Sequence, residues 1–181
     1  IHVPFCAHRC GYCDFTLVAG RDDLADSYLD ALTLEIDRTT CCDELDTLFI
    51  GGGTPTHLRA EQLDRLMQIL RDRFTLSPDA EFSVEANPAG LSNDKLDVLA
   101  NAGANRISLG IQSFDDRDLR VLERDHGREE LRPCIERVQQ RFSNVSFDLI
   151  FAVRKSVVYG KSVDLCGRRI ISKKTPTTLL A

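Results

Sequence analysis

FSVEANPAGLSNDKLDVLANAGANRISLGI, residues 82–111, contains one full repeat of the pattern from which the fold can be predicted. Its two ends, 82–86 and 106–111, are rich in residues that favour β-strands. Between them, Leu96 and Leu99 are spaced as on one face of a helix, with Ser92 as a capping residue. A strand, a helix and a second strand in so short a span predict two parallel strands joined by a helical crossover.

The same alternation extends outward in both directions along the chain. Further β-rich runs occur at 1–5, 47–50 and 145–151. Apolar residues three and four apart recur at 24–36, 63–70 and 131–138. Five strands alternating with helices predict an α/β fold in which helices cover a parallel sheet, and either an open sheet or an incomplete barrel fits this pattern.

Composition places the chain among ordinary globular proteins. Of its 181 residues, 43% are hydrophobic and 28% charged, which is enough to form one domain with a core. We recognise no apolar run of membrane-spanning length and no cleavable signal. Seven cysteines, three of them within eight residues, argue against a secreted disulfide scaffold and predict a reducing compartment, the cytoplasm.

Charge divides the chain near residue 153. Residues 1–153 carry 16 basic and 27 acidic side chains, a net charge of −11. Residues 154–181 carry 7 basic residues and one acidic residue, a net charge of +6. The acidic body argues against nucleic acid as a partner, because binding to phosphate needs clustered positive charge. We expect a core at 1–153 and an irregular basic tail at 154–181.

Polar residues gather where the predicted strands end. They are found at Cys6–Cys13, Gly51–Thr54, Glu85–Pro88 and Gln112–Ser113, with Asp148 on the last strand. The carboxyl ends of parallel strands share one edge of a sheet, and the loops there build active sites. The sequence therefore predicts one site at this edge.

Three cysteines in the first of these segments are spaced as metal ligands. Cys6, Cys10 and Cys13 follow C-x3-C-x2-C and suit a [4Fe–4S] cluster that is held by three of its irons, with the fourth open. A structural zinc site takes four ligands, normally in two pairs, and here only His2 or His8 could supply the fourth. The other cysteines fit small buried apolar residues: Cys41, Cys42, Cys134 and Cys166.

The cysteine spacing, with Tyr12 before the last cysteine, resembles the signature of the radical S-adenosylmethionine (radical SAM) superfamily. Longer strings resemble the oxygen-independent coproporphyrinogen III oxidase-like family, which includes the heme chaperone HemW subgroup. These strings are HVPFC at 2–6, CDF at 13–15, GGGTP at 51–55, EANP at 85–88, NRISLGIQSF at 105–114 and DLIF at 148–151. The resemblance covers about residues 1–153 and implies an incomplete (β/α) parallel barrel with about five βα units.

The resemblance also implies the cofactors. The open iron would chelate S-adenosylmethionine, and one electron would cleave its sulfonium to a 5′-deoxyadenosyl radical and methionine. By matching position, the contacts to S-adenosylmethionine are Tyr12, Gly52, Gly53, Thr54, Glu85, Gln112, Arg124 and Asp148. We expect the glycine turn to let the backbone approach the methionine end. The fork of Arg124 suits a carboxylate, although it could instead pair with Glu123 or Asp125 on the surface.

One position separates the subgroups of this family. The oxidases usually carry a fourth cysteine two residues after the third, where this sequence has Phe15. This resembles the heme chaperones, with heme as cargo, while an oxidase that acts on a porphyrinogen is the alternative. Either would need an electron donor for the cluster. After Val153 the family normally reads Pro-Gly-Gln-Thr, and this sequence reads Arg154-Lys155-Ser156 instead, so we expect 154–181 not to pack as a sixth strand and helix.

Overall fold

The chain folds around one mostly parallel sheet. The computed structural model describes residues 1–39, 44–154, 157–164 and 169–171, with side chains as far as Ile150. Seven strands form this sheet in the order β1-β4-β5-β6-β7-β8-β9. Their bounds are β1 His2–Val3, β4 Glu44–Gly52, β5 Thr75–Ala86, β6 Arg106–Gln112, β7 Asn144–Arg154, β8 Val157–Asp164 and β9 Arg169–Ile171. The first five are parallel to one another, and β8 and β9 are antiparallel to their neighbours.

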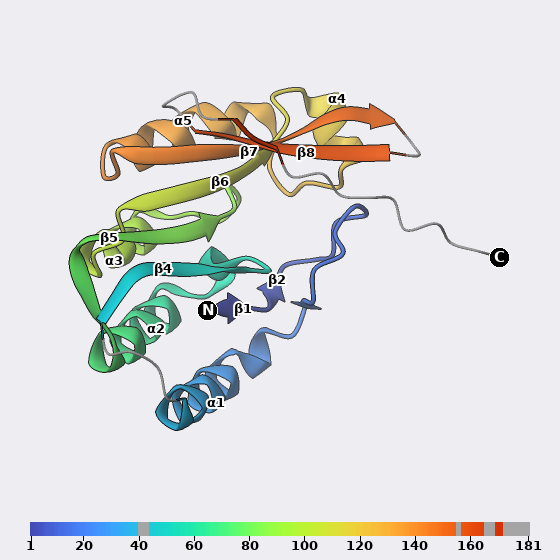
Figure 1. Cartoon of the computed structure of the whole chain (residues 1–181). Coiled ribbons are helices and arrows are strands. Elements are labelled where there is room, and N and C mark those ends of the chain that lie inside the picture. The colour runs from blue at the N-terminus through green and yellow to red at the C-terminus, as the bar shows by residue number, and fades with distance from the viewer. Residues whose placement is uncertain (40–43, 155–156, 165–168, 172–181) are drawn as a thin grey trace.

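Helices connect the parallel strands. They are α1 Ala25–Arg38, α2 Ala60–Arg73, α3 Asn93–Asn101, α4 Asp116–Val121 and α5 Arg128–Gln139, with 3₁₀ turns η1 Asp22–Leu24 and η2 Pro55–His57. Each parallel strand lies beside the next parallel strand in the chain, and the helices that connect them lie on one side of the sheet (Figure 1). This confirms the α/β class and is consistent with a partial barrel.

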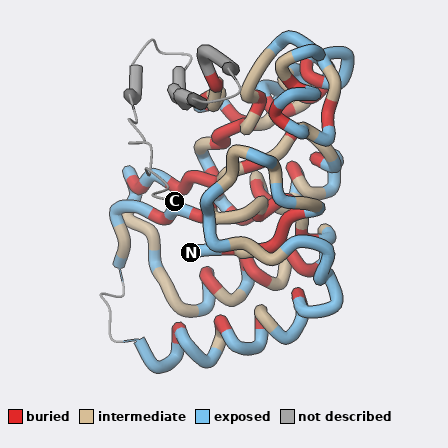
Figure 2. Tube along the Cα trace, turned by 90° about the vertical axis from the view of Figure 1, so that its right-hand side faces the viewer, coloured by how far each residue is buried: buried red, intermediate tan, exposed pale blue. Residues whose placement is uncertain are grey.

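Apolar residues at helical spacing form the core between helices and sheet. On α2, Leu63, Leu66, Met67 and Leu70 are each at most 2% exposed. Their spacing places them on one face, which packs into the same core as Val84 of β5. Figure 2 shows buried segments recurring along the helices and strands while the outer turns stay exposed.

Two polar side chains fix element ends that the sequence indicated. The Ser92 hydroxyl caps α3 by accepting a hydrogen bond from the backbone N of Lys95 (3.4 Å). The Asn105 side chain accepts from the backbone N of Phe82 (2.9 Å) and donates to the carbonyl of Ala80 (2.8 Å), so it ties the start of β6 to β5.

The predicted first strand is divided at Pro4. Before it, β1 pairs with β4; after it, β2 (Phe5–Cys6) pairs with β3 (Val18–Ala19). Proline has no backbone N–H to continue a ladder, and its carbonyl accepts from the backbone N of Val18 (2.8 Å). The segment 7–17 is therefore a loop closed at its base, and it lies beside the carboxyl ends of the strands (Figure 1).

One expectation needs correction. The tail is not irregular throughout, because residues 157–164 and 169–171 form strands β8 and β9. Only residues 155–156 separate β7 from β8, and so short a connection permits antiparallel but not parallel pairing. Within the described residues, β7 is thus followed by a strand rather than a helix, and four helical crossovers join the five parallel strands that the alternation predicted.

In the described part of the chain, no helix has the length and apolar character needed to cross a membrane.

Candidate functional site

The residues predicted for the site gather in one pocket at the carboxyl ends of the strands. They come from the segments that end or follow β2, β4, β5 and β6, and from Asp148 within β7. The pocket lining includes Cys6, Cys10, Tyr12, Cys13, Gly53, Thr54, Glu85, Gln112, Arg124 and Asp148. Gly52, the remaining predicted residue, is not part of the lining; its backbone N donates to Glu85 Oε2 (3.1 Å).

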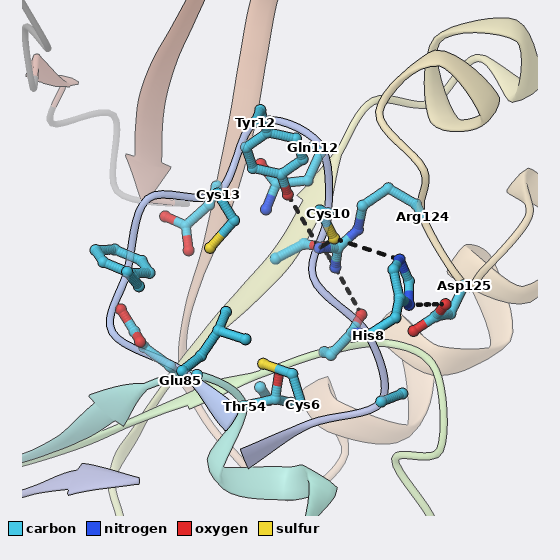
Figure 3. A pocket seen from close by; sticks show the side chains of 18 of the residues that line it. Cys6, His8, Cys10, Tyr12, Cys13, Thr54, Glu85, Gln112, Arg124 and Asp125 are labelled. Carbon is cyan, nitrogen blue, oxygen red and sulfur yellow. Dashed lines mark hydrogen bonds and ion pairs between the residues drawn. The ribbon is translucent and has the colours of Figure 1, made fainter. Parts of the chain in front are cut away.

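The three cysteines, which we call the cluster cysteines, point toward one hollow, Cys6 from the end of β2 and Cys10 and Cys13 from the loop that follows (Figure 3). All three are free thiols. Burial raises the pKa of the Cys6 thiol, and its hydrogen bond with Thr54 Oγ1 (3.3 Å between Sγ and Oγ1) acts in the opposite direction. A metal would supply the positive charge that such a desolvated thiolate lacks, so the donor set fits an iron–sulfur centre.

A single metal ion fits this arrangement less well. Among the described residues, no group of three or more His, Cys, Asp or Glu side chains is close enough to hold one ion. His2, one possible fourth zinc ligand, instead lies with Nε2 against the carbonyl of Thr16 (2.8 Å). A cubane cluster takes each thiolate on a separate iron, so its ligands need not converge on one point.

Arg9 holds the outer limb of the cysteine loop. Its guanidinium donates to the carbonyls of Cys13 (3.2 Å), Phe15 (3.2 Å) and Leu17 (3.5 Å). Within the loop, the backbone N of Cys13 donates to the carbonyl of Cys10 (2.9 Å). These bonds replace the regular pairing that a loop lacks, so one side chain satisfies three carbonyls and fixes the path from Cys13 to β3.

His8 joins the same loop to the segment after α4. Its Nδ1 lies 2.8 Å from Asp125 Oδ1, and its Nε2 lies 2.6 Å from the carbonyl oxygen of Glu123. Its Nε2 is also 3.7 Å from Cys10 Sγ. His8, the other possible fourth zinc ligand, thus links Cys10 to the turn at 123–125, and its side chain is 38% exposed (Figure 3).

The glycine turn makes room for the protein itself. A Cβ at Gly53 would lie 2.8 Å from the carbonyl oxygens of Pro4 and Phe5. A Cβ at Gly52, where φ is +115°, would lie 2.6 Å from the His2 ring, and one at Gly51 would lie 2.6 Å from Glu85 Oε2. We attributed this turn to the approach of a ligand. The contacts show that it is needed first for close packing of β4 against the strand that leads into the cysteine loop.

Glu85 sits at the end of β5 under the glycine turn. Burial raises the pKa of its carboxyl group, and nearby Asp148 acts in the same direction, while the Gly52 backbone N–H and His2 act against them. A carboxylate at this place is therefore poorly solvated and needs further donors, as the ribose or amino group of a ligand would supply.

Arg124 points into the pocket rather than to the surface, so the surface pairing with Glu123 or Asp125 is wrong. Its Nη1 donates to the Tyr12 hydroxyl (3.0 Å) and lies 3.7 Å from Cys10 Sγ. Its Nη2 donates to Asn87 Oδ1 (2.7 Å) and to the carbonyl of Gly110 (2.9 Å). Nε is buried and has no partner in the described part of the chain. The fork is thus used within the protein, and Nε is the donor left for a ligand.

Tyr12 is half-buried against this arginine. Burial is the main cause that raises the pKa of its hydroxyl, to about 12, although the neighbouring Arg124 acts to lower it. The phenol therefore stays neutral at physiological pH, and it accepts from Arg124 with its own proton still available to a ligand.

Gln112 reaches the pocket through an irregular end of β6. Its φ is +66°, and the pairing of β6 with β7 shifts register between Leu109 and Gln112. Gly110 leaves room for this side chain, since a Cβ there would lie 3.1 Å from Gln112 Nε2. A strained residue at a strand end is typical of functional sites, because the surrounding structure must hold it there.

Several residues in and beside the pocket were not predicted. Asn87 and Asp125 line it, and so does Ser108, whose hydroxyl donates to Asp148 Oδ2 (3.0 Å). Asn87 belongs to EANP at 85–88, one of the segments that carry the family resemblance, and it directly follows β5. This position was the signal that could have identified it. Cys134 is buried as expected, at 1% exposure. The other cysteines assigned to burial lie outside the described residues: Cys41, Cys42 and Cys166.

Comparison with known proteins agrees with this geometry. The sequence profile of the radical SAM superfamily matches residues 1–156. The chain is 44% identical to the heme chaperone HemW of Bacillus subtilis over 158 residues, which cover 84% of this chain and 42% of that protein. It is 35% identical to the oxygen-independent coproporphyrinogen III oxidase of Escherichia coli over 160 residues, which cover 86% of this chain and 35% of the oxidase.

A solved structure matches as well. Coproporphyrinogen III oxidase (HemN) from Escherichia coli, described as a radical SAM enzyme, superposes with a TM-score of 0.75 at 35% sequence identity. The match covers 82% of this chain and 35% of that structure. The chain thus spans less than half the length of the relatives it matches.

Proposed function

Because the chain belongs to the radical SAM superfamily, we propose that its pocket holds a [4Fe–4S] cluster and S-adenosylmethionine side by side. The observation that carries this proposal is the convergence of ten predicted residues on one pocket, from the ends of β2, β4, β5 and β6, the segments that follow them, and Asp148 within β7. Residues so far apart in sequence share a pocket only if the fold is built to bring them together.

The cluster cysteines are the proposed ligands. Two sets of side-chain contacts hold the loop that carries them: the bonds from Arg9 to three carbonyls and the contact of His8 with Asp125. The chemistry that a bound cluster supplies is a single electron for the sulfonium of S-adenosylmethionine. The chain itself contributes a fixed loop and a partly buried site in which the thiolates need the charge of the metal.

The remaining pocket residues are proposed to bind S-adenosylmethionine. Glu85 and Asp148 can accept hydrogen bonds from the ribose hydroxyls or the amino group, and Gln112 can both donate and accept. Arg124 can offer Nε to the carboxylate while its Nη1 keeps Tyr12 in place. All four of these residues line the pocket.

For the function of the whole protein we propose heme binding and transfer, as in the HemW chaperones. Phe15 supports this proposal, since it stands where the oxidases usually carry a fourth cysteine. It lines the pocket, and 51% of it is exposed. An apolar ring at this place can contact a flat macrocycle but cannot ligate iron. Porphyrinogen oxidation is the second candidate, favoured by the structural match to the Escherichia coli oxidase.

One experiment tests the cofactors and then separates the two functions. The chain is reconstituted anaerobically with iron and sulfide, its iron is counted, and S-adenosylmethionine is added to the reduced protein. We expect roughly four irons per chain and a changed EPR spectrum. An unchanged spectrum would contradict S-adenosylmethionine binding, and one chromophore-free zinc ion per chain would contradict the cluster.

The same preparation is then titrated with heme and assayed for conversion of coproporphyrinogen III. We expect saturable heme binding, seen as a shifted heme absorbance band, and no protoporphyrinogen. Conversion of coproporphyrinogen without retention of heme would contradict the chaperone proposal and support the oxidase. Phe15→Ala is expected to weaken heme binding, and Phe114→Ala is a control at a similarly exposed phenylalanine outside the pocket lining (48% exposed).

A further inference from the structure

A chain of hydrogen bonds runs along the face of the sheet opposite the helices and ends at Asp148. Arg106 Nη2 donates to Ser146 Oγ (3.0 Å), Ser146 Oγ lies 2.9 Å from Ser108 Oγ, and Ser108 Oγ donates to Asp148 Oδ2 (3.0 Å). Strands β6 and β7 each contribute two of the four residues, and Ser108 pairs with Ser146 in the ladder. Because side chains alternate along a strand, the four residues lie on one face of the sheet, whereas Ile107, between Arg106 and Ser108, faces the core.

The two ends of this chain fix the direction of every hydrogen bond in it. Arginine only donates, and an ionised carboxylate only accepts. The single proton of Ser108 goes to Asp148, so Ser108 must accept from Ser146, and Ser146 must accept from Arg106. No hydroxyl has a second arrangement that satisfies all four groups.

Burial makes this arrangement costly to disturb. Ser146 is 1% exposed and Ser108 is 7% exposed, so water does not readily replace a lost partner. The Arg106 side chain is 16% exposed and lies at the opposite end of the row from the pocket. A group outside the pocket is therefore connected to a carboxylate inside it by buried donors alone.

From this geometry we propose that Arg106, Ser146 and Ser108 form a positioning relay for Asp148. The relay holds the Oδ2 atom of Asp148 toward the sheet, and it thereby orients this carboxylate for the nucleoside of S-adenosylmethionine. The proposal rests on the proposed binding of that cofactor. In this relay Ser108 alone touches Asp148, and the other two residues act through it.

A second branch from the same arginine provides a matched control. Arg106 Nη1 donates to Ser83 Oγ (3.1 Å), and Ser83 donates to Glu81 Oε1 (2.7 Å). Ser83 is 1% exposed, like Ser146, but its branch leads away from Asp148. Replacing either serine by alanine removes one buried acceptor of Arg106, and only one of the two replacements interrupts the path to the pocket.

The test compares Ser146→Ala with Ser83→Ala in the reconstituted full chain, by calorimetric titration with S-adenosylmethionine and by thermal unfolding. We expect both to lose similar thermal stability. Ser146→Ala should weaken binding by about threefold to tenfold, as for the loss of one hydrogen bond, while Ser83→Ala binds within about twofold of the unmodified chain. Ser146→Thr keeps the hydroxyl and should restore most of the affinity.

The outcomes separate the relay from the proposed function. Binding by the unmodified chain together with equal affinities of the two alanine variants would overturn the relay and leave S-adenosylmethionine binding intact. A Ser146→Thr chain that is as stable as Ser146→Ala but binds no better would also overturn the relay. Failure of the unmodified, iron-loaded chain to bind S-adenosylmethionine would overturn both.

Discussion

Gly53→Ser should damage the cysteine loop although residue 53 lies on a different segment. A Cβ at this position would lie 2.8 Å from two backbone oxygens, those of Pro4 and Phe5, where ordinary contacts begin near 3.4 Å. Backbone atoms cannot rotate aside as a side chain can, so the segment directly before Cys6 must shift. Overpacking of this kind costs about 1–3 kcal/mol. For a chain of this length the loss corresponds to a fall in Tm of roughly 2–12 °C.

The matched control is Gly127→Ser. At Gly127, the N-cap of α5, a Cβ would meet only Asp116 Oδ1 at 3.6 Å, an ordinary contact. Serine is a favoured N-cap residue, so this change should preserve or slightly raise the Tm. The assay is thermal unfolding by circular dichroism, followed by iron counting after anaerobic reconstitution. We expect Gly53→Ser to lose iron as well as stability. A Gly53→Ser chain with the Tm and iron content of Gly127→Ser would refute the reasoning.

Three further predictions concern the same site. Replacing any cluster cysteine by alanine should abolish the roughly four irons per chain, whereas Cys134→Ala, buried elsewhere, should retain them in the same iron assay. Burial raises the pKa of Glu85 above its ordinary 4.5, so its ionisation destabilises the folded chain as pH rises above that value. In urea unfolding, the stability of Glu85→Gln relative to the unmodified chain should therefore be greater at about pH 7 than at about pH 5. The same stability difference at both pH values would contradict this. Arg9→Gln should accelerate limited proteolysis within residues 7–17 by about threefold to tenfold, and an unchanged rate would mean that its three carbonyl contacts do not hold the loop.

Local sequence was sufficient for the elements that carry a strong period. The strands at 82–86 and 106–111 and the helix containing Leu96 and Leu99 appear where the alternation predicted them. The short helix α4 was missed, because its six residues contain too few apolar positions to show a period. The expectation of an irregular tail was also wrong for residues 157–164, because neither charge nor family pattern reveals that β7 can pair with an antiparallel strand.

The site divides in the same way. Spacing within one loop indicated the cluster cysteines, and family strings indicated the other pocket residues. The sequence could not indicate the inward direction of Arg124, the His8 link to Asp125 or the row of hydroxyls from Arg106 to Asp148. Each of these depends on atoms from segments that are 38 or more residues apart in the chain, or on a register between two strands.

The sequence by itself therefore determined the type and order of the elements that carry a strong period and the identity of the candidate ligands, because hydrophobic period and ligand spacing are local properties of a chain. Only the tertiary structure decided which side chains share a face, which donors are already used and why Gly53 must be a glycine. Those features depend on strand register and on the approach of Pro4 and Phe5 to β4, and such contacts exist only after the chain has folded.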